Sequence, residues 1–148
     1  MVDNLPVVLV KKLNDNAIIP VLKHEDDAGY DVSSIEDTVI QPGERKLVGT
    51  GLSIAFHPDY VCEVVSRSGL AIKHGVAVLN APGIVDAGYR GELKVILINT
   101  GNEPFTVHIG DRIAQLLFKK IEKPVFKEAS ELPISMRGEG GFGSTGVE

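Results

Sequence analysis

Glycine and proline divide this chain into short runs of β-branched and apolar residues. The 148 residues include 16 Gly and 8 Pro, and helical periodicity is confined to one or two turns at residues 68–73. Short runs of this composition between turn residues are typical of β-strands. Strands are expected at residues 7–10, 51–56, 60–65, 94–98 and 105–109, and turns at 42–43, 80–83 and 100–102. The pattern predicts an all-β sandwich or barrel.

The length suits one domain with a core of its own. Residues 119–131 are mostly charged, contain a proline and resemble a connector. The residues that follow them are rich in glycine. We therefore expect a body at residues 1–132 and a C-terminal arm at residues 133–148.

Net charge and cysteine content exclude several classes of function. A net charge of −5 argues against a nucleic-acid-binding surface, which needs a basic footprint. No apolar run approaches the roughly 20 residues of a membrane span, and the N-terminus lacks a signal-peptide pattern. Cys62 is alone, which excludes an internal disulfide and fits a reducing compartment. We expect no nucleic-acid partner, no membrane and a cytoplasmic location.

Residues 137–146, Arg-Gly-Glu-Gly-Gly-Phe-Gly-Ser-Thr-Gly, combine five glycines with one cation, one aromatic ring and two hydroxyls. So much glycine makes ordering without a partner entropically costly. The ring could stack on a flat group while the guanidinium and hydroxyls bind phosphate. A flap over a flat anionic ligand and a disordered tail both fit these residues.

Residues 80–91, Asn-Ala-Pro-Gly-Ile-Val-Asp-Ala-Gly-Tyr-Arg-Gly, lead into one of the expected strands. Their glycines let a backbone approach a ligand closely or let a hairpin open into a slot. Asp86 is a candidate general base that orients a water, and Tyr89 offers a flat face for a sugar or base. The alternative is a hairpin in which Asp86 caps its own turn.

Residues 66–69, Ser-Arg-Ser-Gly, offer hydroxyls, backbone N–H groups and the Arg67 guanidinium to a phosphate. The alternative is a turn with an exposed arginine. Asp26, Asp27 and Asp31 supply three carboxylates for a hard cation such as Mg²⁺, or form a solvated loop.

Residues 110–117 join a turn to an apolar strand. Asp111 and Arg112 are expected to form an ion pair there, and Gln115 fits either a structural or a ligand-binding role. The histidines lack metal-ligand spacing and, with the lone cysteine, are interpreted as structural or surface residues: His24, His57, His74 and His108.

In chain order, these segments resemble the five motifs of the homotrimeric dUTPases (deoxyuridine triphosphatases). The matching stretches are residues 27–31, 67–73, 83–91, 110–115 and 137–146. Each motif alone is weak, but five in order across nearly the whole chain are specific. The resemblance implies a jelly-roll subunit of a homotrimer. Each site would take phosphate-binding motifs from one chain, a uracil hairpin from a second and the flexible Gly-rich arm from the third.

The resemblance also implies the reaction, in which dUTP and water give dUMP and pyrophosphate by attack at the α-phosphorus. Such an enzyme limits uracil incorporation into DNA and supplies dUMP for thymidylate synthesis. Asp86 would deprotonate the water. Asn80 and the adjoining backbone at Gly83 and Ile84 would read the uracil edge, and Tyr89 would pack beneath the deoxyribose.

The remaining site residues implied by the resemblance contact the phosphates or close over the base. In the body they are Arg67, Ser68, Gly69 and Gln115, with Lys94 a weaker candidate. In the arm, Phe142 would stack on uracil, and the phosphate ligands would come from Arg137, Gly143, Ser144 and Thr145. Mg²⁺ would be held mainly by the substrate phosphates, with Asp31 acting through water. Arg90 and Arg112 would be structural and interfacial.

Departures from the family pattern are small. Many members carry a second acid two residues after the catalytic aspartate, where this chain has Gly88. That change puts local support of the hairpin in doubt rather than the reaction. Two rivals stay open: a dCTP deaminase on the same fold, which would use a glutamate as base, and a binding or regulatory protein, since phage-encoded relatives can signal through protein contacts.

Overall fold

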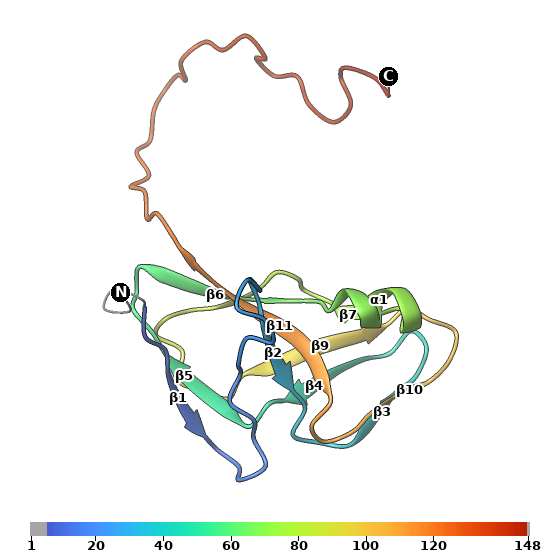
Figure 1. Ribbon diagram of the computed structural model, residues 1–148. Helices are drawn as coiled ribbons and strands as arrows, with labels where there is room; N and C mark the ends of the chain where they lie inside the picture. The colour runs from blue at the N-terminus through green and yellow to red at the C-terminus, as the bar shows by residue number, and fades with distance from the viewer. Residues whose placement is uncertain (1–5, 148) are drawn as a thin grey trace.

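The structure is a computed structural model that describes residues 6–147. Within that range the chain forms eleven short strands and one short helix (Figure 1). In chain order they are β1 (Leu9–Lys12), β2 (Tyr30–Ser33), β3 (Thr38–Ile40), β4 (Arg45–Gly49), β5 (Leu52–Ala55), β6 (Tyr60–Val65), α1 (Ser68–His74), β7 (Val76–Val78), β8 (Gly83–Val85), β9 (Lys94–Asn99), β10 (Phe105–Val107) and β11 (Arg112–Lys120). The all-β prediction is confirmed.

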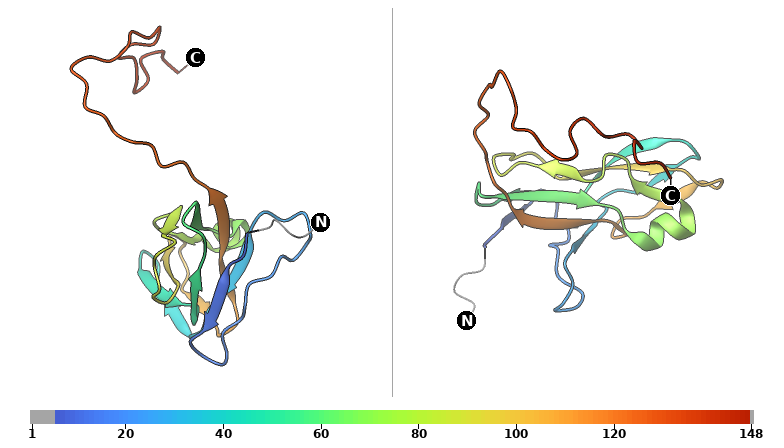
Figure 2. Two further views of the ribbon diagram at one scale, coloured as in Figure 1. Left: turned by 90° about the vertical axis from the view of Figure 1, so that its left-hand side faces the viewer. Right: turned by 90° about the horizontal axis from the view of Figure 1, so that it is seen from above.

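Every strand pairing is antiparallel, and the sheets wrap around one core as a jelly roll (Figures 1 and 2). A four-stranded sheet has the order β2-β11-β6-β8, and a three-stranded sheet has the order β4-β9-β7. Two smaller sheets pair β1 with β5 and β10 with β3. The largest fully buried side chains come from several of these sheets: Ile40, Leu52, Leu97 and Ile113. Each such side chain contributes about 2 kcal/mol by leaving water.

Strand β11 is the central element of the four-stranded sheet, because it pairs with β2 on one side and β6 on the other. Its residue Gln115 lies opposite Asp31 of β2 and opposite Val65, the last residue of β6. The chain then turns into helix α1, which ends at Gly75 in the left-handed conformation (φ 67°). Three segments far apart in the sequence therefore meet at one end of this sheet.

Within residues 80–91 no strand pairs with β8, so the segment is open rather than a closed hairpin. Strand β7 before it pairs with β9, whereas β8 within it pairs with β6. The two neighbouring strands therefore belong to different sheets. The segment bridges the sheets where they diverge, and this is where a cavity opens.

Regular structure ends at Lys120, and the last backbone hydrogen bond to the body joins Ile121 N to Asp59 O at 2.8 Å. Residues 122–147 contain no helix or strand and extend away from the body (Figures 1 and 2). The arm boundary at residue 132 and the arm's flexibility stay predictions. Within residues 6–147 there is no helix of the length and apolar character that a membrane crossing needs.

Candidate active site

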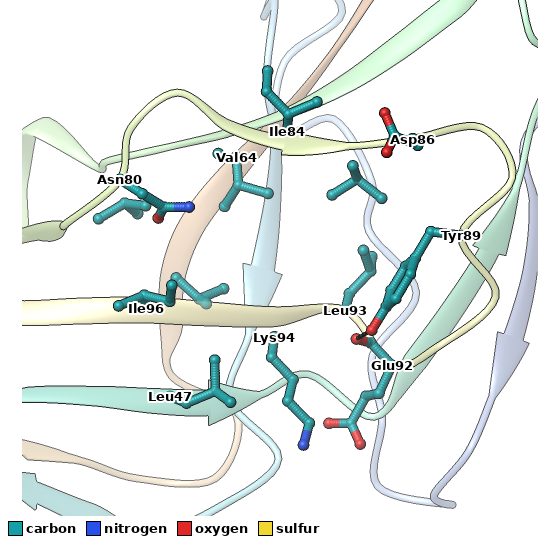
Figure 3. A pocket seen from close by; sticks show the side chains of 14 residues that line it. Leu47, Val64, Asn80, Ile84, Asp86, Tyr89, Glu92, Leu93, Lys94 and Ile96 are labelled. Carbon is teal, nitrogen blue, oxygen red and sulfur yellow. Dashed lines mark hydrogen bonds between the residues drawn. The ribbon is translucent and has the colours of Figure 1, made fainter.

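A cavity of about 290 Å³ lies between strands β8 and β9, where the two larger sheets separate (Figure 3). Its walls are mostly apolar, and we call it the Asp86 cavity. The predicted base, sugar and catalytic residues all line it: Asn80, Gly83, Ile84, Asp86 and Tyr89. Lys94, predicted as a weaker phosphate ligand, lines it too. Apolar side chains complete it: Leu47, Val64, Val78, Val85, Leu93, Val95 and Ile96.

Asp86 follows β8 directly and is exposed. The local turn is closed by backbone, because Tyr89 N donates to the carbonyl oxygen of Asp86 at 3.0 Å. Among residues 6–147, no hydrogen bond or ion pair engages the Asp86 carboxylate. The carboxylate therefore does not cap its own turn, and it is available to a water at the rim of an apolar cavity.

Tyr89 closes one end of this cavity, as Figure 3 shows. Its hydroxyl donates to the carbonyl oxygen of Glu92 at 3.0 Å. Tyr89 as a whole residue is 47% exposed and therefore accessible to a ligand. Because the Tyr89 hydroxyl already has a hydrogen-bond partner, the aromatic face is left to pack against a sugar.

At the other end, Asn80 lies close to Gly83. A Cβ at Gly83 would approach the Asn80 Nδ2 atom to 3.3 Å, so glycine gives that side chain room. Lys94 lies at the start of β9, beside Glu92 and on the opposite side of the cavity from Asp86 (Figure 3). Lys94 thus joins the Asp86 cavity and not the predicted phosphate ligands of the same chain.

A second cavity, of about 400 Å³, lies at the end of the four-stranded sheet where β2, β11 and α1 meet. We call it the Arg67 cavity. It is lined by the predicted phosphate ligands of the body together with Asp31: Arg67, Ser68, Gly69 and Gln115. Ser66 serves structure instead, because its hydroxyl accepts the N–H of Val78 at 2.8 Å.

Asp31 joins two arginines in this cavity. Its Oδ1 lies 3.4 Å from Arg67 Nε, and its Oδ2 lies 3.2 Å from Arg112 Nη1. Arg67 Nη1 also donates to the carbonyl oxygen of Arg112 at 3.0 Å. One carboxylate thus holds two guanidiniums that would otherwise repel each other.

The expected Asp111–Arg112 ion pair is wrong. Arg112 turns to Asp31, and Asp111 Oδ2 accepts the His108 N–H at 2.9 Å in its own turn. Arg112 thus has a structural partner in Asp31, and its interfacial role stays a prediction. Sequence adjacency misled here because Asp111 belongs to the turn before β11, where its carboxylate bonds the backbone, whereas Arg112 is the first residue of the strand.

Asp26, Asp27 and Asp31, the predicted ligands of a cation, do not form a metal-binding cluster. Within residues 6–147, no cluster of three or more His, Cys, Asp or Glu could hold a metal ion. Asp27 Oδ2 accepts the His24 N–H at 2.9 Å, and Asp31 is paired as above. These carboxylates therefore do not form a cation site by themselves in the described part of the chain.

The arm residues named as ligands lie away from both cavities in this chain (Figure 1). Arg137 Nε donates to Gly140 O at 2.7 Å, and Gly138 N donates to Ser135 Oγ at 3.0 Å. Phe142 is fully exposed. The described contacts of residues 137–147 are therefore within the arm, and the same holds for Gly143, Ser144 and Thr145.

The two cavities are separate within one chain. They flank the four-stranded sheet, one at β8 and the other at β2 and β11. Three strand spacings of roughly 4.8 Å put β2 and β8 about 14 Å apart. The predicted base ligands and the predicted phosphate ligands thus line two different cavities of one chain.

Two cavity residues went unnoticed in the sequence. Lys23 lines the Arg67 cavity and Glu92 lines the Asp86 cavity. A lone lysine carries no local signal. Glu92 directly follows the third motif, and this position is the one sequence signal that could have marked it as a cavity residue.

Cys62 is buried in β6 as expected. Burial raises the pKa of its thiol to about 12, and the neighbouring Glu63 charge adds to that rise. The thiol stays protonated at neutral pH and has no access to either cavity.

Comparison with known proteins identifies the family of this chain. The dUTPase family model matches residues 15–146. The deoxyuridine 5'-triphosphate nucleotidohydrolase of Clostridium kluyveri is 51% identical over 140 residues, covering 95% of this chain and 98% of the relative. That of Clostridioides difficile is 55% identical over 137 residues, covering 93% and 96%.

Solved structures extend the similarity to three dimensions. The Staphylococcus bacteriophage 80alpha dUTPase with dUPNHPP superposes with a TM-score of 0.89 at 31% identity, covering 95% of this chain and 99% of the other. A mutant dUTPase of phage phi11 of S. aureus, described for its coordination of a structural Mg(II) ion, gives 0.80 at 27% identity, covering 85% and 98%. The chain belongs to the dUTPase family.

Proposed function

We propose that this protein is a dUTP diphosphatase that hydrolyses dUTP to dUMP and pyrophosphate. The observation that carries the proposal is the Asp86 cavity. A carboxylate with no described partner lies at the rim of an apolar pocket that also presents Asn80 and Tyr89. Near neutral pH such a carboxylate can accept a proton from water.

In the proposed reaction a water oxygen attacks the α-phosphorus. The bond from that phosphorus to the oxygen bridging to the β-phosphorus breaks, and pyrophosphate leaves with that oxygen. Asp86 orients the water and takes its proton. Because the cavity walls around Asp86 are apolar, bulk water has little access once a base fills the pocket.

Substrate selection follows from the shape and polarity of the same cavity. Asn80 and the backbone beside Gly83 and Ile84 would pair with the uracil edge. A cytosine would leave buried donors or acceptors unpaired, at about 1–3 kcal/mol each. Tyr89 would pack against the deoxyribose and leave no space for a 2′-hydroxyl.

The triphosphate would bind in the Arg67 cavity of a neighbouring copy of the chain. Arg67, Ser68, Gly69 and Gln115 are the proposed ligands there, and we add Lys23 because it lines the same cavity. Mg²⁺ bound to the phosphates would neutralise their charge, with Asp31 near it through water.

We further propose that each complete site forms between copies of the chain in a homotrimer. The Asp86 cavity and the Arg67 cavity would each be a half-site, and the support is that the proposed base ligands and the proposed phosphate ligands lie at opposite edges of the four-stranded sheet in one chain. The arm would close each site, with Phe142 on the base and Arg137, Gly143, Ser144 and Thr145 near the outer phosphates. Its extension away from its own body fits this role (Figure 1).

The compartment and metabolic role follow from this activity. The buried lone Cys62 fits a reducing compartment, and we propose the cytoplasm. Removing dUTP there limits uracil incorporation into DNA and provides dUMP for thymidylate synthesis.

The test is release of pyrophosphate from dUTP with Mg²⁺, run beside dCTP, dTTP and UTP. We expect turnover of dUTP alone, with dUMP as the co-product. Release of ammonia from dCTP would support a deaminase instead. No turnover of any nucleotide would contradict the enzymatic proposal and favour a binding role.

A further inference from the structure

The ring of Tyr89 lies directly over the Cα of Gly91. A Cβ added at Gly91 would fall 2.5 Å from Tyr89 Cζ and 2.9 Å from Cε2, and closer still to the hydroxyl oxygen. Real Cβ atoms essentially never come this near to another heavy atom. Gly91 does not have a positive φ, so close approach of the ring, and not backbone conformation, is what demands glycine here.

The backbone beneath the ring is held firmly. Ser53 Oγ donates to Arg90 O at 2.7 Å, and Thr50 Oγ1 donates to Leu93 O at 2.7 Å. Leu93 N donates to Leu52 O at 2.7 Å. Residues on both sides of Gly91 are thus fixed to β5 and the β4–β5 connection, and the Gly91 backbone forms a rigid support.

The ring above is the part that can move. Tyr89 is 47% exposed, and its contact with the support is completed by the hydroxyl donation to Glu92 O at 3.0 Å. A side chain at Gly91 would meet the far end of an exposed side chain rather than backbone. The Tyr89 ring would therefore tilt outward while the loop stayed in place.

We propose that Gly91 is a specificity-determining residue that holds Tyr89 at the depth needed to exclude a 2′-hydroxyl. The inference rests on the proposed function, in which the Tyr89 ring packs against the sugar. A methyl group at Gly91 would displace the ring, disrupt its bond to Glu92 O and admit ribose. Gly91 is thus a positioning residue that acts through Tyr89.

The chain offers a matched control three residues away. A Cβ at Gly88 would meet nothing within 4 Å, and Gly88 likewise has no positive φ. Gly88→Ala and Gly91→Ala are therefore the same substitution in the same loop, and they differ in whether the new methyl group meets Tyr89.

The experiment measures kcat/KM for dUTP and for UTP in five proteins: the wild type, Gly88→Ala, Gly91→Ala, Tyr89→Ala and the double variant Tyr89→Ala/Gly91→Ala. We expect Gly91→Ala to lower the dUTP-to-UTP ratio about tenfold or more, and Gly88→Ala to leave it at the wild-type value. In the Tyr89→Ala background, the added Gly91→Ala change should have no further effect on the ratio.

The outcomes separate the inference from the proposed function. A wild type that does not hydrolyse dUTP, or hydrolyses UTP equally well, contradicts the proposed function. With a selective wild type, an unchanged ratio in Gly91→Ala overturns the inference. So does a large loss of Tm in Gly91→Ala that persists in the double variant, because the methyl group would then be colliding with the fold and not with Tyr89.

Discussion

At the scale of single residues, the feature that matters most is a carboxylate left without a partner. Asp31 forms ion pairs, and Asp27 and Asp111 each accept a backbone N–H. No such contact is described for the Asp86 carboxylate. A carboxylate with a structural role stabilises the fold through an ion pair or a charge-assisted hydrogen bond with its partner. One kept free beside an apolar cavity is better explained by chemistry.

Asp86→Asn keeps the shape of this side chain and removes its capacity as a base. We expect kcat for dUTP to fall about 10³-fold, with substrate affinity and oligomeric state unchanged. Pyrophosphate release, equilibrium binding of dUTP and size-exclusion chromatography measure these three properties. Asp59→Asn, at an exposed carboxylate beside His57, is the control. Near-normal turnover in Asp86→Asn would remove Asp86 from its assigned role.

The Cys62 thiol gives a prediction about pH. Its pKa is raised from 9.0 to about 12, so between these values the unfolded thiol ionises and the folded one does not. Stability from this group is present below pH 9 and falls as pH rises toward 12. Iodoacetamide at pH 9 should therefore label the protein in urea and leave the native protein almost unlabelled. Rapid native labelling would contradict the burial of Cys62.

At the scale of elements, β11 and its neighbours bring distant motifs together. Asp31 on β2 and Arg112 on β11 are 81 positions apart, yet they pair because the two strands are adjacent. Gly29 belongs to the same junction, since a Cβ there would collide with the Gln115 side chain. The pairing of β2 with β11 thus shapes the Arg67 cavity.

Asp31→Asn removes the charge that holds Arg67 and Arg112 in place. The pair is partly exposed, with Asp31 and Arg67 side chains 23% and 24% accessible, so we expect at most about 1 kcal/mol of stability to be lost. KM for dUTP should rise about tenfold, because Arg67 would no longer be aimed into the cavity. Steady-state kinetics measure this change. Asp111→Asn, next to Arg112 but bonded in its own turn, should leave KM unchanged, and an equal KM in both variants would refute the role of Asp31.

The sequence predicts an element when the element's own residues specify it, and fails when the element depends on strands distant in the chain. The strand at residues 60–65 is predicted with its observed bounds, because all its residues but Glu63 are apolar or aromatic and turn residues flank it. Strands β2 and β8 look like parts of motifs rather than strands, since they are short and contain Asp or Gly. Their stability comes from β11 and β6, which no local window contains. The motifs named the residues that line both cavities, but the Asp31–Arg112 pair and the roles of Lys23 and Glu92 required the topology.

At the scale of the whole molecule, the body and the arm differ in what supports them. The body has a buried core drawn from all its sheets, whereas the described hydrogen bonds of residues 137–147 stay within the arm. Folding of the body should therefore not depend on these residues.

Deleting residues 137–148 tests this division. We expect kcat/KM for dUTP to fall about 100-fold or more, because Phe142 and Arg137 no longer close the site. The Tm of the body should shift by only about 2 °C. Calorimetry and pyrophosphate release give both values. A deleted protein that fails to fold would contradict the arm's role as a lid.

The most direct test of the account is complementation between two inactive subunits. Asp86→Asn damages one half-site and Arg67→Ala the other, and the two chains would be co-expressed with different tags and purified through both. If each site of a trimer joins the Asp86 cavity of one chain to the Arg67 cavity of another, about one site in three is intact in every trimer that carries both tags, and activity should recover to about one third of wild type. Activity no higher than that of either variant purified alone would show that each site lies within one chain, and would contradict the account.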